Sequence, residues 1–250
     1  MKMELMDRAK LEVLNKRGLR YNLQDAEKDY VLSVLLKIIY GSKLADKLVF
    51  KGGTALYHCY LEQVRFSSDM DFTAKSAVAV EEFQNLFSEN SWIEIKDVAE
   101  KKHGFDIIVK YSAVLSQPDS IVINVNTKQK VLLESKKLKY RNKYDLDVDC
   151  FVMDEQEIFA EKIRTINERV KPRDCYDLSM LRRYKKIDIP YCVKLAKSKE
   201  SYIPITKEYM LRNLQIIISG YDKEMKELYY AEKVTKEDAE KLVREITELV

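Results

Sequence analysis

Two neighbouring stretches decide the fold of this chain, Lys51-Gly52-Gly53-Thr54-Ala55-Leu56 and Arg65-Phe66-Ser67-Ser68-Asp69-Met70-Asp71-Phe72. The apolar run 48–50 predicts a buried strand, so the glycine pair ends a strand and opens a helix that Thr54 can cap. Glycines at such a turn let backbone N–H groups face an anion at close range. On a strand, the spacing of Asp69 and Asp71 puts both carboxylates on one face. A phosphate beside two carboxylates needs a cation between them, and Mg²⁺, which prefers oxygen ligands, is the natural choice. We therefore expect metal-dependent chemistry on a nucleotide.

The composition is that of a folded protein with a sizeable core. The chain has 250 residues, of which 46% are hydrophobic and 34% charged. Its net charge of +3 gives no overall attraction to nucleic acid, so any basic surface must be local. The four cysteines lack CxxC spacing and no signal peptide precedes them, which predicts reduced thiols and a cytoplasmic location. No apolar run approaches the roughly 20 residues of a membrane span, so we expect no membrane partner.

The pattern of apolar residues predicts an α+β fold, with a mixed sheet first and helices afterwards. We expect strands at 48–50, 66–73, 92–98, 104–112, 119–127, 136–141 and 147–152. We expect helices at 1–17, 24–40, 54–61, 78–88, from Asp154 onward, and at 174–184, 190–198, 206–219, 221–232 and 235–249. The expected division is a core with two leading helices over 1–153 and an all-helical C-terminal domain over 154–250.

A second group of charged residues lies in the helical part. It comprises Glu161-Lys162 and then Arg169-Val170-Lys171-Pro172-Arg173-Asp174-Cys175-Tyr176-Asp177-Leu178. A lysine on a helix can neutralise phosphate as a point charge, whereas an arginine can bind it through two hydrogen bonds. Taken alone, the string also fits a solvated, charged helix end.

Both groups resemble motifs of one family, and in the same order. The first resembles the opening motif of the nucleotidyltransferase superfamily that includes DNA polymerase beta, and more closely that of the AbiEii toxin family. The second resembles the last motif of that family. The resemblance implies a nucleotidyltransferase-like mixed β-sheet flanked by helices. It implies that Gly52, Gly53, Thr54 and Ser68 bind the nucleotide, with Lys171 and Arg173. It also implies that Asp69 and Asp71 bind metal, and that Lys162 and Asp174 are catalytic or contact the nucleotide.

The same resemblance implies a reaction and partners. The expected enzyme is a nucleotidyltransferase that uses Mg²⁺ (or Mn²⁺) to move a nucleoside monophosphate from an NTP to an acceptor, with tRNA or another RNA among the acceptors. It would be the toxin of a bacterial toxin–antitoxin, abortive-infection or phage-defence system, with a DNA-binding repressor as its antitoxin. The helical domain would close the active-site cleft.

One position departs from the superfamily pattern. A third carboxylate is expected on a later strand, but the strand 119–127 carries Asn124 there. Asparagine can bind a metal through its carbonyl oxygen but cannot act as a base. Asp106, on a neighbouring strand, is the other candidate for this position. The departure leaves open an alternative, a catalytically impaired nucleotide-binding module that acts through a protein partner. An antibiotic-modifying nucleotidyltransferase would share the fold.

Overall fold

The computed structural model describes residues 2–18, 20–199, 203–227 and 230–250, which form two compact units. The first, called the sheet unit here, consists of Met1–Cys59, Ser67–Val131 and Ser135–Val152. The second, called the helical unit, consists of Tyr60–Phe66, Leu132–Glu134 and Met153–Val250. The predicted division into 1–153 and 154–250 differs from this one, because it would assign Tyr60–Phe66 and Leu132–Glu134 to the core and not to the helical part. The closure of a cleft by the helical part stays a prediction.

The sheet unit is built on a mixed sheet of seven described strands in the order β3-β4-β5-β2-β1-β7-β6. Neighbouring strands run antiparallel except for the parallel pairs β2–β5 and β1–β7. The strand bounds are β1 Leu48–Lys51, β2 Met70–Ala74, β3 Ile93–Lys101, β4 Gly104–Ser112, β5 Pro118–Asn126, β6 Lys136–Lys139 and β7 Asp149–Val152. A mixed sheet followed by helices agrees with the predicted fold class.

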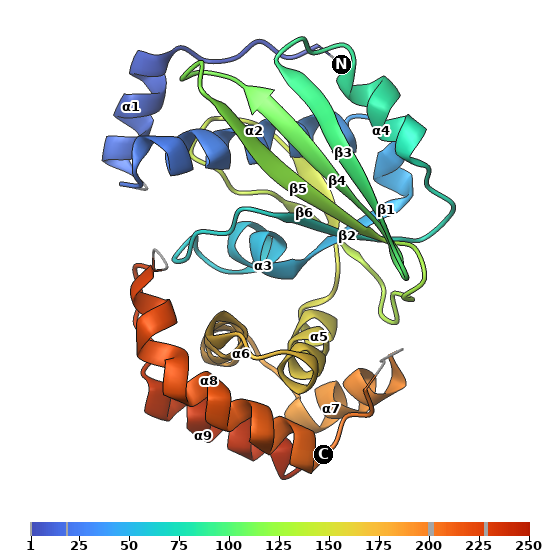
Figure 1. The fold of residues 1–250 in the computed structure, drawn as a ribbon, viewed down its shortest axis with the longest axis vertical. Helices are drawn as coiled ribbons and strands as arrows, with labels where there is room; N and C mark the ends of the chain where they lie inside the picture. The colour runs from blue at the N-terminus through green and yellow to red at the C-terminus, as the bar shows by residue number, and fades with distance from the viewer. Residues whose placement is uncertain (1, 19, 200–202, 228–229) are drawn as a thin grey trace. The chain divides into compact units, whose positions relative to one another are not determined.

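The two faces of the sheet differ in chemistry because side chains alternate along each strand. One face carries large apolar side chains such as Phe50, Phe72 and Ile123, all fully buried. Helices α2 (Leu23–Tyr40) and α4 (Val80–Phe87) belong to this unit, and α2 crosses the sheet as Figure 1 shows. The other face carries polar side chains at the centre of the sheet, and these include the predicted metal ligand Asp71.

Three predictions about the sheet unit need correction. The first helix, α1, spans Arg8–Arg17 and not 1–17, because Asp7 caps its start by accepting a hydrogen bond from the Lys10 amide. Strand β2 begins at Met70, so Asp69 precedes the strand instead of lying on it. The helix after the glycine pair begins at Gly52, with α3 (Gly52–Ala55) passing into a π-helical turn, η2 (Leu56–Tyr60). A 3₁₀ turn, η1 (Lys43–Asp46), precedes β1.

The helical unit contains the helices from α5 onward, shown in Figure 1 in yellow to red. Their bounds are α5 Glu155–Glu168, α6 Pro172–Tyr184, α7 Ile189–Ser198, α8 Lys207–Glu227 and α9 Lys236–Thr247. Asp154 caps α5 as predicted, since it accepts the Gln156 amide at 2.8 Å. Two helices were expected at 206–219 and 221–232, but α8 continues through Gly220, so the glycine does not end the helix. None of the described helices is long and apolar enough to cross a bilayer.

Candidate active site

Gly52 and Asp71 approach each other too closely for any residue but glycine at position 52. Gly52 follows β1 directly and has φ +76°, a conformation that glycine adopts without strain. A Cβ atom placed there would lie 2.2 Å from Oδ2 of Asp71. The turn predicted to hold phosphate and the carboxylate predicted to hold metal are therefore adjacent in the sheet unit.

Four polar side chains form a row across the polar face of the sheet. The strand registers place Lys51 opposite Asp71, Asp71 opposite Asn124, and Asn124 opposite Asp106. Residues directly opposite each other share a face of the sheet. The Asn124 side-chain amide donates a hydrogen bond of 3.0 Å to Oδ1 of Asp71. Asn124 thus lies on the strand where a third ligand was expected, and its amide contacts the carboxylate that is predicted to bind metal.

Asp106 is one strand further from Asp71 and already has a cationic partner. Lys101 Nζ lies 3.2 Å from its carboxylate, whose side chain is 24% exposed. Two strand spacings, about 9.4–9.8 Å, separate Asp106 from Asp71. To share an ion with Asp71 it would have to lean across Asn124, and its role as a third ligand stays a prediction.

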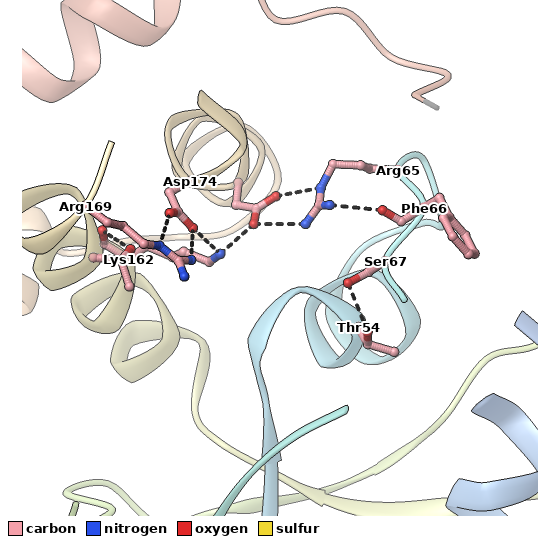
Figure 2. A network of polar contacts seen from close by, with 9 residues as sticks. Thr54, Arg65, Phe66, Ser67, Lys162, Arg169 and Asp174 are labelled. Carbon is pink, nitrogen blue, oxygen red and sulfur yellow. Dashed lines mark hydrogen bonds and ion pairs between the residues drawn. The ribbon is translucent and has the colours of Figure 1, made fainter. Parts of the chain in front are cut away.

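Thr54 fixes the main chain of the aspartate motif. It lies inside the first turn of α3, whose N-cap is Lys51, so its predicted capping role is wrong. Its buried hydroxyl instead donates to the Asp69 carbonyl oxygen at 2.5 Å and shares a 3.0 Å hydrogen bond with Ser67, as Figure 2 shows for Ser67. The half-buried Asp69 and Ser68 are in this loop. Thr54 therefore ties the loop before β2 to the glycine turn.

The side chains of Asp69 and Asp71 suit a divalent cation that takes most of its ligands from water and substrate and few from the protein. Asp69 and Asp71 have hard carboxylate oxygens, and the absence of a Cβ at Gly52 lets the Asp71 carboxylate lie against the glycine turn. Among the described residues no group of three or more His, Cys, Asp or Glu side chains could hold a metal ion. The donor set therefore suits Mg²⁺ completed by water and substrate phosphates, and not a closed cage supplied by the protein.

In the helical unit, the second motif forms a buried network of ion pairs. Arg65 binds Asp177 through two hydrogen bonds, of 3.0 Å and 3.1 Å. Lys162 Nζ lies 2.7 Å from Asp177 and 2.8 Å from Asp174. Arg169 in turn donates twice to Asp174, at 2.8 Å and 3.0 Å. Figure 2 shows the chain of contacts from Arg65 to Arg169.

Burial and charge act in opposite directions on this network. Burial alone would lower the pKa of Lys162, but Asp174 and Asp177 outweigh it and raise that pKa above its ordinary value. Burial alone would raise the pKa of Asp174, yet Lys162 and Arg169 bring it well below its usual range. Arg65 and Lys162 similarly lower the pKa of Asp177 against the effect of burial. All three groups are therefore charged at neutral pH.

Lys171 and Arg173 stand outside the network. Pro172 begins α6, so Lys171 is its N-cap residue and Arg173 lies in its first turn. Lys171 is exposed and Arg173 half-buried, and neither forms an ion pair with any residue that the structure describes. Lys171 and Arg173 are therefore the cations of the second motif whose charge is available to bind a ligand.

Within the sheet unit, the structure joins Gly52, Asp71 and Asn124, and within the helical unit it joins Lys162 and Asp174. Two further residues escaped the sequence interpretation. Arg169 stands in the quoted string, but only the turn between α5 and α6 reveals that it binds Asp174. Lys51 precedes the glycine pair, and its place opposite Asp71 follows only from the register of β1 and β2.

His58 packs inside the sheet unit. It is 1% exposed, and its Nδ1 lies 2.8 Å from the carbonyl oxygen of Arg141. Its ring stacks on Tyr140 with 4.3 Å between centroids. It belongs to the core of the sheet unit.

The family model described as nucleotidyl transferase AbiEii toxin, type IV toxin–antitoxin system, matches residues 34–243. A search of curated sequences gives no match. Among solved structures, MenT4, a nucleotidyltransferase toxin from Mycobacterium tuberculosis H37Rv, is similar with a TM-score of 0.62 and 16% identity over 96% of this chain and 98% of that one. JHP933 from Helicobacter pylori is similar with a TM-score of 0.60 and 16% identity over 90% and 91% of the two chains. A nucleotidyltransferase-type protein from H. pylori gives 0.56 and 17% over 90% and 92%. These structures share the fold, and the family match over most of the sequence shows that this chain belongs to the AbiEii family of nucleotidyl transferase toxins of type IV toxin–antitoxin systems.

Proposed function

We propose that this toxin transfers a nucleoside monophosphate from an NTP to an acceptor hydroxyl in a Mg²⁺-dependent reaction that releases pyrophosphate. The observation that carries the proposal is the close approach of Gly52 to Asp71. The turn that we expect to face an anion is therefore next to the carboxylate to which we assign a metal, and a metal-bound triphosphate needs both. Neither feature alone would distinguish an NTP site from a simple phosphate or cation site.

Residues of the sheet unit would hold the triphosphate and the metal. Asp69 and Asp71 are the metal ligands, and Asn124 restrains Asp71 through its amide. A bound Mg²⁺, or Mn²⁺ in its place, would supply charge neutralisation for the phosphates and a lower pKa for the attacking hydroxyl. The amides of the Gly52–Gly53 turn and the Ser68 hydroxyl orient the phosphates. Thr54 keeps Asp69 in place through its main chain.

Residues of the helical unit would stabilise the leaving pyrophosphate. Lys171 and Arg173 have no ion-pair partner among the described residues, so their charge is available to phosphate oxygens. Lys162 is already bound to two carboxylates, and to reach a phosphate it would have to exchange one of them for the ligand. Asp174 acts by positioning Lys162 and Arg169.

The acceptor oxygen forms a bond to the α-phosphorus while the bond to pyrophosphate breaks, and the hydroxyl proton leaves to a base. Asn124 cannot take that proton, so Asp106 or solvent must. An RNA end, with tRNA as the first candidate, offers the required hydroxyl. The toxin–antitoxin family implies an antitoxin partner, for which we propose a DNA-binding repressor.

The test is incorporation of a labelled NTP into bulk tRNA, with Mg²⁺, with Mn²⁺ and with EDTA. Asp71→Asn and Asp69→Asn should each lower incorporation by about 100-fold or more, the scale of losing a charge-stabilising group. Asp147→Asn is a matched control because this side chain is 80% exposed. Unchanged incorporation by Asp71→Asn would refute the mechanism.

The Asn124–Asp71 hydrogen bond favours a second candidate, a nucleotide-binding module that acts through a protein partner. An asparagine in the third ligand position removes a base and a charge from the site. Such a module would bind NTP with Mg²⁺ by calorimetry yet incorporate no label into any acceptor. Turnover sensitive to Asp71→Asn excludes it.

A further inference from the structure

Lys51 faces the polar side of the sheet directly opposite Asp71. The two residues are partners in the antiparallel register of β1 and β2. Side chains in this relationship have Cβ atoms about 4.5–5.5 Å apart. A cationic side chain therefore leaves the backbone beside the carboxylate to which we assign a metal.

The side chain of Lys51 does not point away from this face but crosses it. Its ammonium donates a hydrogen bond of 3.2 Å to Oε1 of Gln129. Gln129 comes shortly after β5, and its backbone amide is held at 2.8 Å by the Asn126 side chain. Since β2 lies between β1 and β5, the Lys51–Gln129 pair spans β2 on the face that carries Asp71.

The burial and the hydrogen bonding of Gln129 favour a role in ligand binding. It is 5% exposed, and within the described structure its Nε2 has no hydrogen-bond partner. A buried amide that leaves its donor unused costs about 1–3 kcal/mol in general, so such groups need an explanation. Here the amide oxygen holds the ammonium, and the nitrogen remains a donor for an anion.

We propose that Lys51 is the resident counterion of Asp71, positioned by Gln129. With no divalent cation present, the ammonium occupies the carboxylate face. When the cation arrives with an NTP, the ammonium moves to a phosphate oxygen. This inference rests on the proposed function, since it takes Asp71 to be a metal ligand.

The consequence is that metal and nucleotide bind cooperatively. A positive charge next to Asp71 weakens binding of a cation alone, by Coulomb repulsion. The same charge strengthens binding of the metal–nucleotide pair, because it finds a phosphate to neutralise. Lys51 therefore makes occupation of the metal site conditional on the substrate.

The experiment is Mn²⁺ binding by the full chain, followed by electron paramagnetic resonance, without nucleotide and with a non-hydrolysable NTP analogue. Lys51→Met should tighten Mn²⁺ binding without nucleotide on the order of tenfold, within the usual range of coupling between sites. It should also lose most of the gain that the analogue gives the wild type. Gln129→Leu should change both affinities in the same directions, and Lys51→Arg should restore the wild-type pattern.

Lys128→Met is the matched control, since Lys128 is exposed, adjoins Gln129 and carries the same charge. It should leave both Mn²⁺ affinities unchanged. Circular dichroism of each variant identifies any that fail to fold. If Lys51→Met fails to fold, Gln129→Leu carries the test, and Lys51→Arg is the variant expected to behave like the wild type.

Two results would overturn the inference in distinguishable ways. Mn²⁺ binding that is lost in Asp71→Asn but is not tightened by Lys51→Met would refute the counterion role alone. Failure of all variants, including Lys51→Met, to bind Mn²⁺ would refute both this role and the metal site of the proposed function.

Discussion

The side-chain amide of Asn124 donates a 3.0 Å hydrogen bond to Oδ1 of Asp71 across the parallel strands β5 and β2. A carboxylate at position 124 would put two negative charges in that contact. The amide therefore stabilises Asp71 without metal, at the expense of a third metal ligand. This contact and others within the two units support five predictions.

Asn124→Asp should make the thermal stability of the sheet unit depend on bound metal. Loss of a hydrogen bond to a charged group costs about 1.5–3 kcal/mol, and repulsion between carboxylates adds to it. We expect the melting temperature without metal to fall by roughly 3–12 °C, because 1 kcal/mol corresponds to about 2–4 °C at this chain length. Saturating Mn²⁺ should raise it more than it raises the wild type. Equal Mn²⁺-induced shifts in thermal unfolding would contradict a third-ligand position at 124.

Gly52→Ala should damage the site through a single added carbon. The new Cβ would meet Oδ2 of Asp71 at 2.2 Å, in a backbone conformation with φ +76° that disfavours alanine. We expect a loss of about 1–3 kcal/mol in unfolding free energy from the backbone alone, and loss of nucleotide transfer. Urea unfolding and the incorporation assay measure the two effects.

Gly220→Ala provides the matched control for that substitution. Gly220 lies inside α8, and nothing stands within 4 Å of its missing Cβ. Alanine there should stabilise the helix by about 0.5–1 kcal/mol and leave transfer unchanged. If both variants behaved alike, the contact between position 52 and Asp71 would have no special role.

Asp177→Ala should be among the most destabilising substitutions in the helical unit. It leaves Arg65 and Lys162, both buried, without a carboxylate that each contacts. Removing one partner from a buried ion pair generally costs about 3–5 kcal/mol, measured here as the change in urea unfolding free energy. Glu248→Ala, which breaks the exposed pair with Lys207, should cost less than about 1 kcal/mol. A comparable loss in both variants would show that the network contributes no more than a surface pair.

The lowered pKa values of Asp174 and Asp177 predict acid sensitivity. A carboxyl whose pKa is lower in the folded state contributes stability above its ordinary pKa, about 3.9, and loses it as the pH falls through the folded value. The difference in unfolding free energy between wild type and Asp174→Asn should thus be constant near neutral pH and shrink below about pH 4. Asp147→Asn is the control, and equilibrium unfolding between pH 3 and pH 7 is the measurement. A difference independent of pH would mean that Asp174 titrates normally.

The raised pKa of Lys162 predicts a loss of stability at the alkaline end. A cation whose pKa is higher in the folded state contributes stability below its ordinary pKa, about 10.4 for lysine, and loses it as the pH rises through the folded value. The unfolding free energies of Lys162→Met and of the wild type should therefore converge only above the folded-state pKa of Lys162.

Local patterns were enough to predict the α+β class, the strand before Gly52 and the helices from Asp154 onward. Local patterns failed where a contact between residues far apart in the sequence determines the structure. Thr54 looks like a helix cap because its type favours that position, but its hydroxyl is used by the loop before β2. Gly220 looks like a helix end, yet the apolar positions on both sides of it, such as Ile217 and Tyr221, are buried on one continuous helix.

The candidate site shows the same limit. The residue types at Gly52, Asp71 and Asn124 pointed to the site, but their distances depend on the order β1-β2-β5, which no local pattern encodes. Lys51 illustrates this most clearly. The sequence analysis assigns it no role, and only the register of β1 and β2 shows that it lies opposite Asp71.

The ion-pair network of the helical unit alternates in sign from end to end, with three cations and two anions in the order Arg65, Asp177, Lys162, Asp174 and Arg169. Each aspartate of this chain lies between two cations, whereas each terminal arginine contacts one aspartate of the chain. Loss of an aspartate therefore removes an anion from two cations, whereas loss of a terminal arginine leaves its aspartate still paired with Lys162. The five positions are thus unequal under mutation, and a change at Arg169, 46% exposed, should be tolerated better than a change at either buried aspartate.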